Sequence, residues 1–270
     1  LTATPGDTWT DYMPVFIANG FYKNKTEFID RHVVYDMYSS YPRIKYYVNT
    51  DYLVKLKEKI MVNMYYEKHA TAHEIYISSD YNESLYKTTQ KELYNPFKKA
   101  PIRNASELCY VLREIVNKDD SKLIHLDRIY RAKKKVIVFY NFNYELEMLK
   151  NFAITNKYSF AEWNGHVHES IPDTDEWLYF VQYSAGAEGW NCILTNTLVF
   201  FSMSYSYKQT IQAAGRIDRL NTPYDDLYYY YIKTNSSIDK AIEKTLKRKE
   251  KFNANSFVEN SLDIKFVERM

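Results

Sequence analysis

From about residue 104 to residue 252, short apolar runs alternate with amphipathic segments. Runs such as Val136 to Tyr140 carry almost no polar residues, which is typical of strands that are buried on both faces. We expect strands at 136–140, 161–164, 178–183, 197–202 and 227–232, and helices at about 143–152, 207–219 and 236–252. This order predicts an α/β fold in which helices cover both faces of a parallel sheet. Such sheets hold their ligands at the carboxyl ends of the strands.

The first two helices of this region have recognisable signals. Asn104 is followed three residues later by Glu107, as in a capping box, and apolar residues at helical spacing come next. A second amphipathic segment runs from Leu123 to Tyr130. Residues 21–103 show helical patches without a sustained alternation, so we expect a mainly helical connecting region there, and a tail or short helix at 253–270.

The composition is that of a globular, soluble chain, with 270 residues of which 46% are hydrophobic and 26% charged. No apolar run approaches the length of about 18 residues that a membrane span needs. The formal net charge of +2 does not by itself predict a polyanion partner. Cys109 and Cys192 lie far apart without zinc-site spacing, which favours a reducing, cytoplasmic compartment.

Glycine is scarce, so we expect each of the six glycines to mark a special backbone position. Gly186 and Gly189 directly follow the strand at 178–183, in the stretch Ser184 to Asn191. A turn of this kind can bring backbone amides close to a phosphate. An ordinary turn between a strand and the next element explains the same spacing, and glycine spacing alone favours that explanation.

Gln212, Arg216 and Arg219 are spaced to project from one face of a helix or from its end, next to Gly215. Two guanidiniums and an amide at one place suit a triphosphate, because guanidinium groups bind phosphate oxygens in pairs. A solvated helix face, with Asp218 paired to one arginine, is the plainer explanation for an arbitrary pair of this spacing.

The other parts of an ATP site are missing from this sequence. A P-loop needs Gly followed by Lys, and none of the six glycines precedes a lysine. The pair Asp175-Glu176 comes before a strand, whereas a magnesium-binding pair is expected after one. The chain begins with Leu1 rather than Met, which suggests a fragment. It can therefore supply arginines to an ATP site but not the phosphate cradle or the metal ligands.

Basic runs and a histidine pair are further candidates for binding sites. The basic runs 131–135 and 244–251 can contact a phosphate backbone, although such runs more often form solvated faces. His166 and His168 have no third ligand in register, so a metal site is not expected. The 28 tyrosines occur in a sequence that is also rich in Lys and Asn, and a codon bias toward A and T explains their number better than base stacking does.

The chain resembles the carboxyl-terminal half of a helicase superfamily two motor, most closely the Swi/Snf-like branch and bacteriophage DEAD/DEAH-box helicases. Residues 212–219 resemble motif VI, Gln-x-x-Gly-Arg-x-x-Arg, at all four fixed positions. Residues 184–191 resemble motif V, with Ala187 in place of its second glycine, and residues 136–142 and 1–5 resemble motifs IV and III. Leu112-Arg113 with Asn117, and Ser121-Lys122-Leu123, match further family patterns. The likeness spans residues 1 to about 252.

The resemblance implies a role for each matching residue. Arg219 and Arg216 would be catalytic, as arginine finger and second phosphate contact. Gln212, Gly189 and Gly215 would bind ATP. The residues that contact nucleic acid or couple it to ATP would be Thr2, Thr4, Ser184, Gly186 and Asn191.

The resemblance also implies a division of the chain and its partners. Residues 1–20 would end a first RecA-like lobe, 21–103 would connect, 104–252 would form the second RecA-like lobe, and 253–270 a tail. ATP and Mg²⁺ would be the cofactors, with the metal ligands in the missing N-terminal lobe. The partners would be that lobe and nucleic acid, DNA being favoured over RNA, in a host cytoplasm if the protein comes from a phage.

A non-catalytic module that binds nucleic acid or acts as a scaffold, and keeps the lobe without a motor, is the alternative. An unrelated nucleotide-binding enzyme ranks last because the phosphate loop is missing. The sequence leaves open DNA against RNA, unwinding against translocation on duplex, polarity and oligomeric state.

Overall fold

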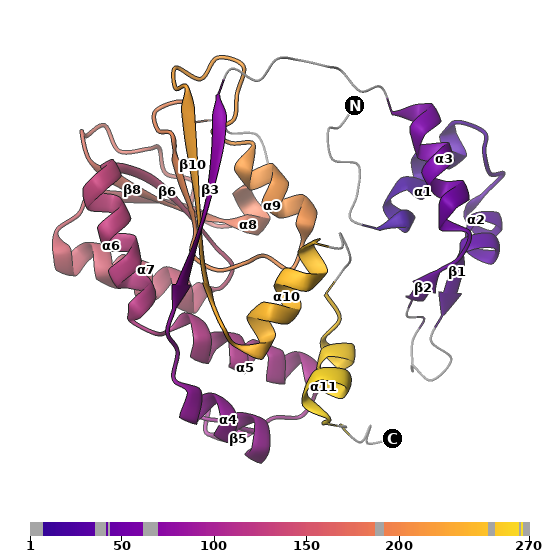
Figure 1. The fold of residues 1–270 in the computed structure, drawn as a ribbon, viewed down its shortest axis with the longest axis horizontal. Coiled ribbons are helices and arrows are strands. Elements are labelled where there is room, and N and C mark those ends of the chain that lie inside the picture. Colours follow the sequence, from indigo (N-terminus) through magenta and orange to yellow (C-terminus); the bar gives the residue numbers. More distant parts are fainter. Residues whose placement is uncertain are drawn as a thin grey trace. The chain divides into compact units, whose positions relative to one another are not determined.

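The computed structural model describes residues 8–35, 42, 44–61, 70–186, 192–247, 252–264 and 266, and the chain divides into two compact units (Figure 1). The first unit is Leu1–Glu67 and the second is Lys68–Met270. Each unit is described by itself below.

The first unit is mainly helical and has a small core of its own. Its elements are α1 (Trp9–Ala18), α2 (Lys25–His32), β1 (Val33–Tyr35), β2 (Ile44–Tyr47) and α3 (Thr50–Ile60). The strands β1 and β2 pair antiparallel. Phe16, Phe28 and Leu53 are fully buried, one from each helix. These helices are therefore held together by apolar packing rather than by the short strand pair.

The second unit is built on a six-stranded sheet in the order β3-β10-β9-β6-β8-β7, in which every pairing is parallel. The strands are β3 (Thr71–Ser79), β6 (Lys135–Tyr140), β7 (Phe160–Trp163), β8 (Trp177–Gln182), β9 (Thr197–Phe200) and β10 (Asp226–Thr234). The residues of β6, β8 and β9 are almost all buried. Continuous burial explains why these strands read as uninterrupted apolar runs in the sequence.

Helices cover both faces of this sheet (Figure 1). The helices and short strands of the unit are α4 (Glu83–Glu92), β4 (Tyr94–Asn95), β5 (Ala100–Pro101), α5 (Ala105–Asn117), α6 (Ser121–Lys133), α7 (Asn143–Asn156), α8 (Tyr183–Gly186), α9 (Tyr207–Ala214), α10 (Ser237–Lys247) and α11 (Ala254–Leu262). Leu126 of α6 and Leu149 of α7 pack on one face, and Ala213 of α9 packs on the other. The predicted α/β class, with a parallel sheet covered on both sides, is confirmed.

The structure differs from the expected elements in two places. It places β3, a strand of the parallel sheet, inside the region 21–103, where we expected mainly helices; the short strands β1, β2, β4 and β5 lie in the same region. It also ends α9 at Ala214, whereas we expected a helix as far as residue 219. The other predicted strands and helices are present within a few residues, and the expected short C-terminal helix is α11. The functional division of the chain at residues 20, 103 and 252 stays a prediction.

None of the helices in the described ranges is both long enough and apolar enough to cross a lipid bilayer.

Candidate functional site

The predicted arginines lie on the turn that follows α9. Ser206 caps the start of this helix by accepting a hydrogen bond from the Gln209 amide at 3.1 Å. At the other end, the Arg216 amide donates to the Ala213 carbonyl at 3.0 Å. This bond joins residues three apart, instead of four apart as in an α-helix, so it tightens the last turn and ends the helix. Of the two positions that the spacing left open, a helix face or the helix end, Arg216 and Arg219 occupy the second, because both lie on the turn beyond Ala214.

Gly215 is the C-cap of α9, with an ordinary φ of −66°. A Cβ at this position would lie 3.5 Å from the Ile211 carbonyl oxygen and 3.6 Å from that of Gln212, both normal contact distances. The expectation that each glycine marks a special backbone position is therefore wrong here. Gly20 in the first unit, with a φ of 75°, is the described glycine that adopts a left-handed conformation.

Arg216 and Arg219 lie close enough for their charges to interact. Arg216 is 6% exposed, and its pKa is lowered by burial and, further, by the charge of Arg219. The Nε of Arg219 is buried and has no hydrogen-bond partner among the described groups. Ile217, between them in the chain, is fully buried in the core and anchors the turn. Two like charges in a partly buried place are unfavourable by themselves, and an anion that contacts both would relieve the cost.

The backbone of this turn lies toward the amino ends of the strands. The Ala214 carbonyl accepts a 3.3 Å hydrogen bond from Tyr229, which is in the first half of β10. The Arg216 carbonyl accepts a 3.1 Å bond from the amide of Cys192, a few residues ahead of β9. The expectation of a ligand site at the carboxyl ends of the strands is therefore not met by the turn that carries the arginines.

The remaining predicted residues are spread over several places. Ser184 is exposed on α8, which begins directly after the carboxyl end of β8 and ends at Gly186. Gln212 is half-buried on α9, and α8 packs against α9. Thr2, Thr4, Gly189 and Asn191 lie outside the described residues. The structure therefore brings Arg216 and Arg219 together and places Gln212, Ser184 and Gly186 on two adjoining helices.

The carboxyl edge of the sheet between β6 and β9 is filled by the protein's own polar side chains. The chain passes from one side of β6 to the other between β8 and β9, and ligands of open sheets bind at such a switch point. Here that place is taken by a buried polar cluster, which consists of Arg113, Asn117, Lys122, Asn141, Glu145 and Ser202.

Glu145 is the centre of the buried polar cluster and is fully buried. Its Oε2 accepts hydrogen bonds from the Asn141 amide at 2.7 Å and from the Ser202 hydroxyl at 2.9 Å. Its Oε1 accepts one from the Asn117 side chain at 2.7 Å. The carboxylate thus occupies the start of α7, where a helix would otherwise attract an external anion. The sequence analysis did not predict a role for Glu145. The available signal was its position three residues after Phe142, where a glutamate can accept a hydrogen bond from the backbone at the start of a helix.

Arg113, Asn117 and Lys122, which the sequence marked by family resemblance, prove to be buried residues of this cluster. Lys122 donates to the Asn117 side chain at 2.8 Å and to the Phe201 carbonyl at 3.1 Å. Arg113 donates to the Met203 carbonyl at 2.8 Å and lies between the rings of Phe142 and Tyr205. These contacts hold the segment that leads from β9 into α9.

The histidine pair and the basic run 131–135 receive no support as sites from the geometry, and residues 248–251 of the other basic run lie outside the described residues. His168 stacks on Trp163 at 4.3 Å, and within the described ranges no three His, Cys, Asp or Glu side chains are arranged to hold a metal. In the basic run 131–135, Arg131 pairs with Asp127 and Lys134 with Glu176, as on a solvated face.

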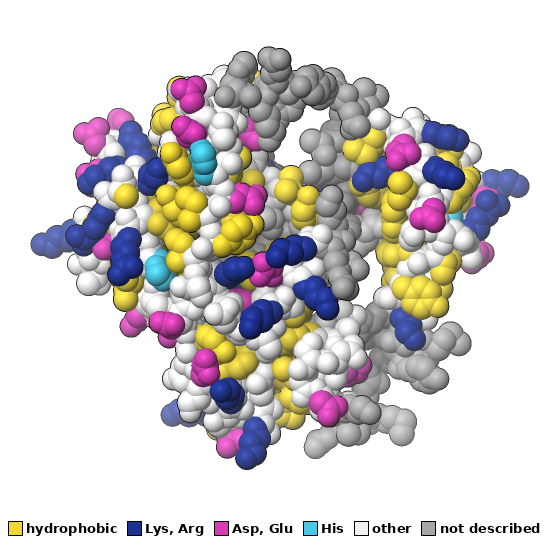
Figure 2. Space-filling view, in the orientation of Figure 1, with side chains coloured by type: hydrophobic (Ala, Val, Ile, Leu, Met, Phe, Trp, Pro, Cys, Tyr) yellow, Lys and Arg dark blue, Asp and Glu magenta, His cyan; other side chains and the backbone are white. Residues whose placement is uncertain are grey.

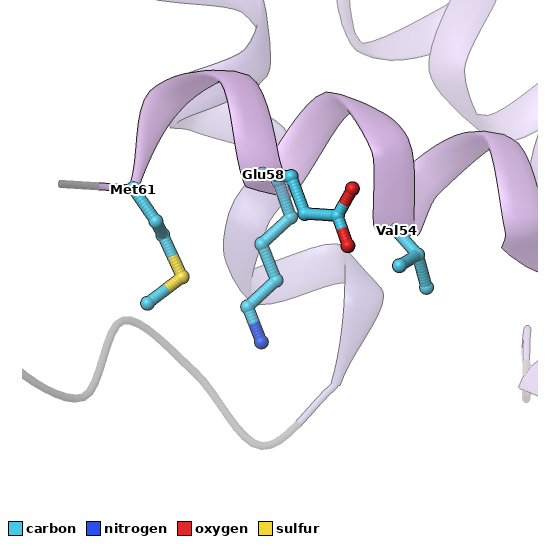
Figure 3. A pocket seen from close by; sticks show the side chains of 4 residues that line it. Val54, Glu58 and Met61 are labelled. Atoms are coloured by element: carbon cyan, nitrogen blue, oxygen red, sulfur yellow. The ribbon is translucent and has the colours of Figure 1, made fainter. Parts of the chain in front are cut away.

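A hollow of about 330 Å³ lies along α3 of the first unit. Its described lining is Val54, Lys57, Glu58 and Met61, and Figure 3 shows the three labelled side chains projecting from the same side of the helix. No predicted site residue that the structure describes belongs to this lining. The hollow therefore does not bear on the ATP site.

No protein family model and no curated protein matches the chain. Among solved structures, the chain is similar to the one described as "Crystal structure of the C-terminal part of Fun30 ATPase domain". The TM-score is 0.46 and the sequence identity 16%, and the match covers 67% of this chain and 72% of that chain.

Proposed function

We propose that this chain is the second RecA-like lobe, with its connecting region, of an ATP-driven nucleic-acid helicase or translocase. The observation that carries the proposal is the pair of guanidiniums on the turn after α9. Arg216 is nearly buried beside the charge of Arg219, and the Nε of Arg219 is buried without a hydrogen-bond partner in the described part of the chain. Such a pair is suited to a triphosphate because each guanidinium can donate several hydrogen bonds to phosphate oxygens.

In this proposal the nucleotide is held by a partner lobe that supplies the phosphate cradle and the metal ligands. Mg²⁺, when bound there, neutralises charge on the phosphates. Arg219 donates to the γ-phosphate as charge develops in the transition state, and Arg216 contacts a second phosphate oxygen. Gln212 and Gly215, next to the arginines along α9, approach the nucleotide, as does Gly189. Closure of the two lobes brings the arginines into place.

The nucleic acid would be contacted through residues of the motif V and motif III stretches. Ser184 and Gly186 at the end of β8, with Asn191, Thr2 and Thr4, offer small hydroxyls and backbone amides to a phosphate backbone. We favour DNA over RNA as the substrate. Because α8 packs against α9, a displacement at the nucleic acid can reach the arginine turn through two adjoining helices.

Replacing Arg219 by alanine tests the catalytic assignment. In the protein that includes the nucleotide-binding lobe, we expect Arg219→Ala to lower nucleic-acid-stimulated ATP hydrolysis by about a thousandfold. The fold should be intact by circular dichroism. Arg128→Ala, which removes an exposed arginine of α6, is the matched control and should keep full activity. A normal rate of hydrolysis in Arg219→Ala would remove the assignment.

The isolated chain separates a motor lobe from a non-catalytic module. We expect the purified 270 residues to hydrolyse no ATP alone and to gain activity when a lobe with a P-loop and an Asp-Glu motif is supplied. ATP turnover by the isolated chain would contradict the proposal. If no such lobe restores activity, the alternative of a nucleic-acid-binding or scaffold module is favoured.

A further inference from the structure

A second surface of the molecule combines an exposed aromatic ring with lysines. Tyr76 lies on β3, the last strand on its side of the sheet, and is 53% exposed. Figure 2 shows Lys and Arg side chains gathered over α10. We propose that Tyr76 and the lysines of β10 and α10 bind single-stranded nucleic acid, with an unpaired base stacked on the Tyr76 ring. The inference rests on the proposed nucleic-acid function; it joins lysines of the predicted basic run 244–251 to an aromatic ring that lies outside the predicted motifs.

The ring of Tyr76 is held in place by a row of aromatic side chains. Tyr76 stacks on Tyr231, its partner across the strand pair, at 4.9 Å between ring centroids with 14° between the planes. Tyr231 stacks in turn on Phe200 of β9 at 4.5 Å, and Phe200 is 1% exposed. The Tyr76 hydroxyl donates to Glu74 at 2.9 Å. An incoming base would therefore meet an ordered ring and lose little side-chain entropy to it.

One lysine contacts this ring directly, and it is linked through Glu243 to the lysines of α10. The Nζ of Lys233 lies 5.0 Å from the centre of the Tyr76 ring and 2.8 Å from an oxygen of Glu243. Lys247 pairs with the other oxygen of Glu243, also at 2.8 Å. Lys240 and Lys244 are exposed on the same helix.

The charge of this surface is positive. The four lysines face two carboxylates, those of Glu74 and Glu243, and Glu243 is already paired with two of the lysines. Asp239 of α10, a third carboxylate, is buried and accepts hydrogen bonds from Thr234, which leaves the four lysines against three carboxylates. The local excess of positive charge favours a polyanion over a neutral partner.

The combination of ring and lysines selects the kind of nucleic acid. Proteins that hold single strands stack bases on aromatic rings and track the phosphates with cations. In a duplex the base faces are covered by neighbouring pairs, so a ring at the surface gains nothing from them. We therefore assign this surface to an unpaired strand.

Binding of a fluorescent fifteen-nucleotide thymidine strand to the 270-residue chain, followed by anisotropy, tests this inference. We expect Tyr76→Ala to weaken binding about tenfold, because the variant loses the stacking of one base on the ring. Tyr76→Phe should keep the affinity. Tyr94→Ala, which removes a tyrosine on β4 that is 41% exposed, is the matched control and should bind like the unchanged chain.

Three further measurements separate stacking from charge. An abasic strand should bind the unchanged chain and Tyr76→Ala equally, because it offers no ring to stack. The double variant Lys240→Ala, Lys244→Ala should reduce the dependence of affinity on salt concentration. Polyglutamate of matched length should compete poorly with the thymidine strand.

Two results would overturn the inference: equal affinity of Tyr76→Ala and the unchanged chain for the thymidine strand, or equal competition by polyglutamate. Thermal unfolding of each variant checks that the sheet is intact. The outcome is independent of the catalytic proposal, because binding of the thymidine strand to the 270-residue chain is measured without ATP and without a second lobe.

Discussion

At the scale of single residues, burial of charge is the most demanding feature of the second unit. Arg113, Lys122 and Glu145 are all fully buried. Burial lowers the pKa of Lys122, since the charged form loses its hydration. Lys122 donates to the Asn117 side chain and to the Phe201 carbonyl, whereas Arg113 donates through Nη2 to the Met203 carbonyl and its Nε and Nη1 are buried without a partner among the described groups. Such a cluster is costly to disturb because every group in it depends on another.

Glu145→Gln should lower the free energy of unfolding by about 3 kcal/mol. The carboxylate accepts hydrogen bonds on both oxygens, and the amide nitrogen of glutamine would face a donor at one of them. The substitution would also remove the negative charge of Glu145, which favours the charged form of Lys122. Chemical denaturation measures the change. Glu147→Gln, at an exposed position of the same helix, should be neutral, and equal stabilities of the two variants would contradict this account of Glu145.

At the scale of elements, local signals set the helix starts, and long-range pairing sets the edge of the sheet. Asn104 accepts a hydrogen bond from the Glu107 amide at 2.9 Å, and the Glu107 carboxylate accepts one from the Arg103 amide at 2.9 Å. The start of α5 predicted from sequence is thus confirmed. By contrast β3 has alternating exposure and no apolar run, and its strand pairing comes from β10, far along the chain.

Asn104→Ala should destabilise the second unit by about 1 kcal/mol, because the Glu107 amide loses its side-chain acceptor at the first turn of α5. Asn104→Ser provides another oxygen at the same place and should retain most of the stability. Urea denaturation of the three proteins measures the difference. Equal loss in the alanine and serine variants would show that the effect is not one of capping.

At the scale of the whole molecule, the two units have separate hydrophobic cores. The core of the first unit is formed by residues between Trp9 and Ile60, and Phe28 lies within it, fully buried. The sheet of the second unit is packed by other clusters. Units that share no core residues can unfold separately.

Phe28→Ala should destabilise the first unit by about 4 kcal/mol, since it removes a buried ring and leaves a cavity. The unfolding transition of the second unit should keep its temperature in differential scanning calorimetry. Leu149→Ala, in the core of the second unit, is the complementary variant and should shift the other transition. A single transition that moves in both variants would show that the units unfold together.

The sequence by itself determined the α/β class and the strands of the sheet interior, because a strand buried on both faces must be apolar at every position. It also determined the cap of α5, since a cap depends on residues three apart. Tertiary structure alone decided the rest. The place of β3 depends on pairing with β10, the position of the arginine turn on burial of Ile217 in the core, and the role of Glu145 on the distant donors Asn117 and Ser202. Interactions between residues far apart in the chain leave no periodic mark in the sequence, so local patterns do not reveal them.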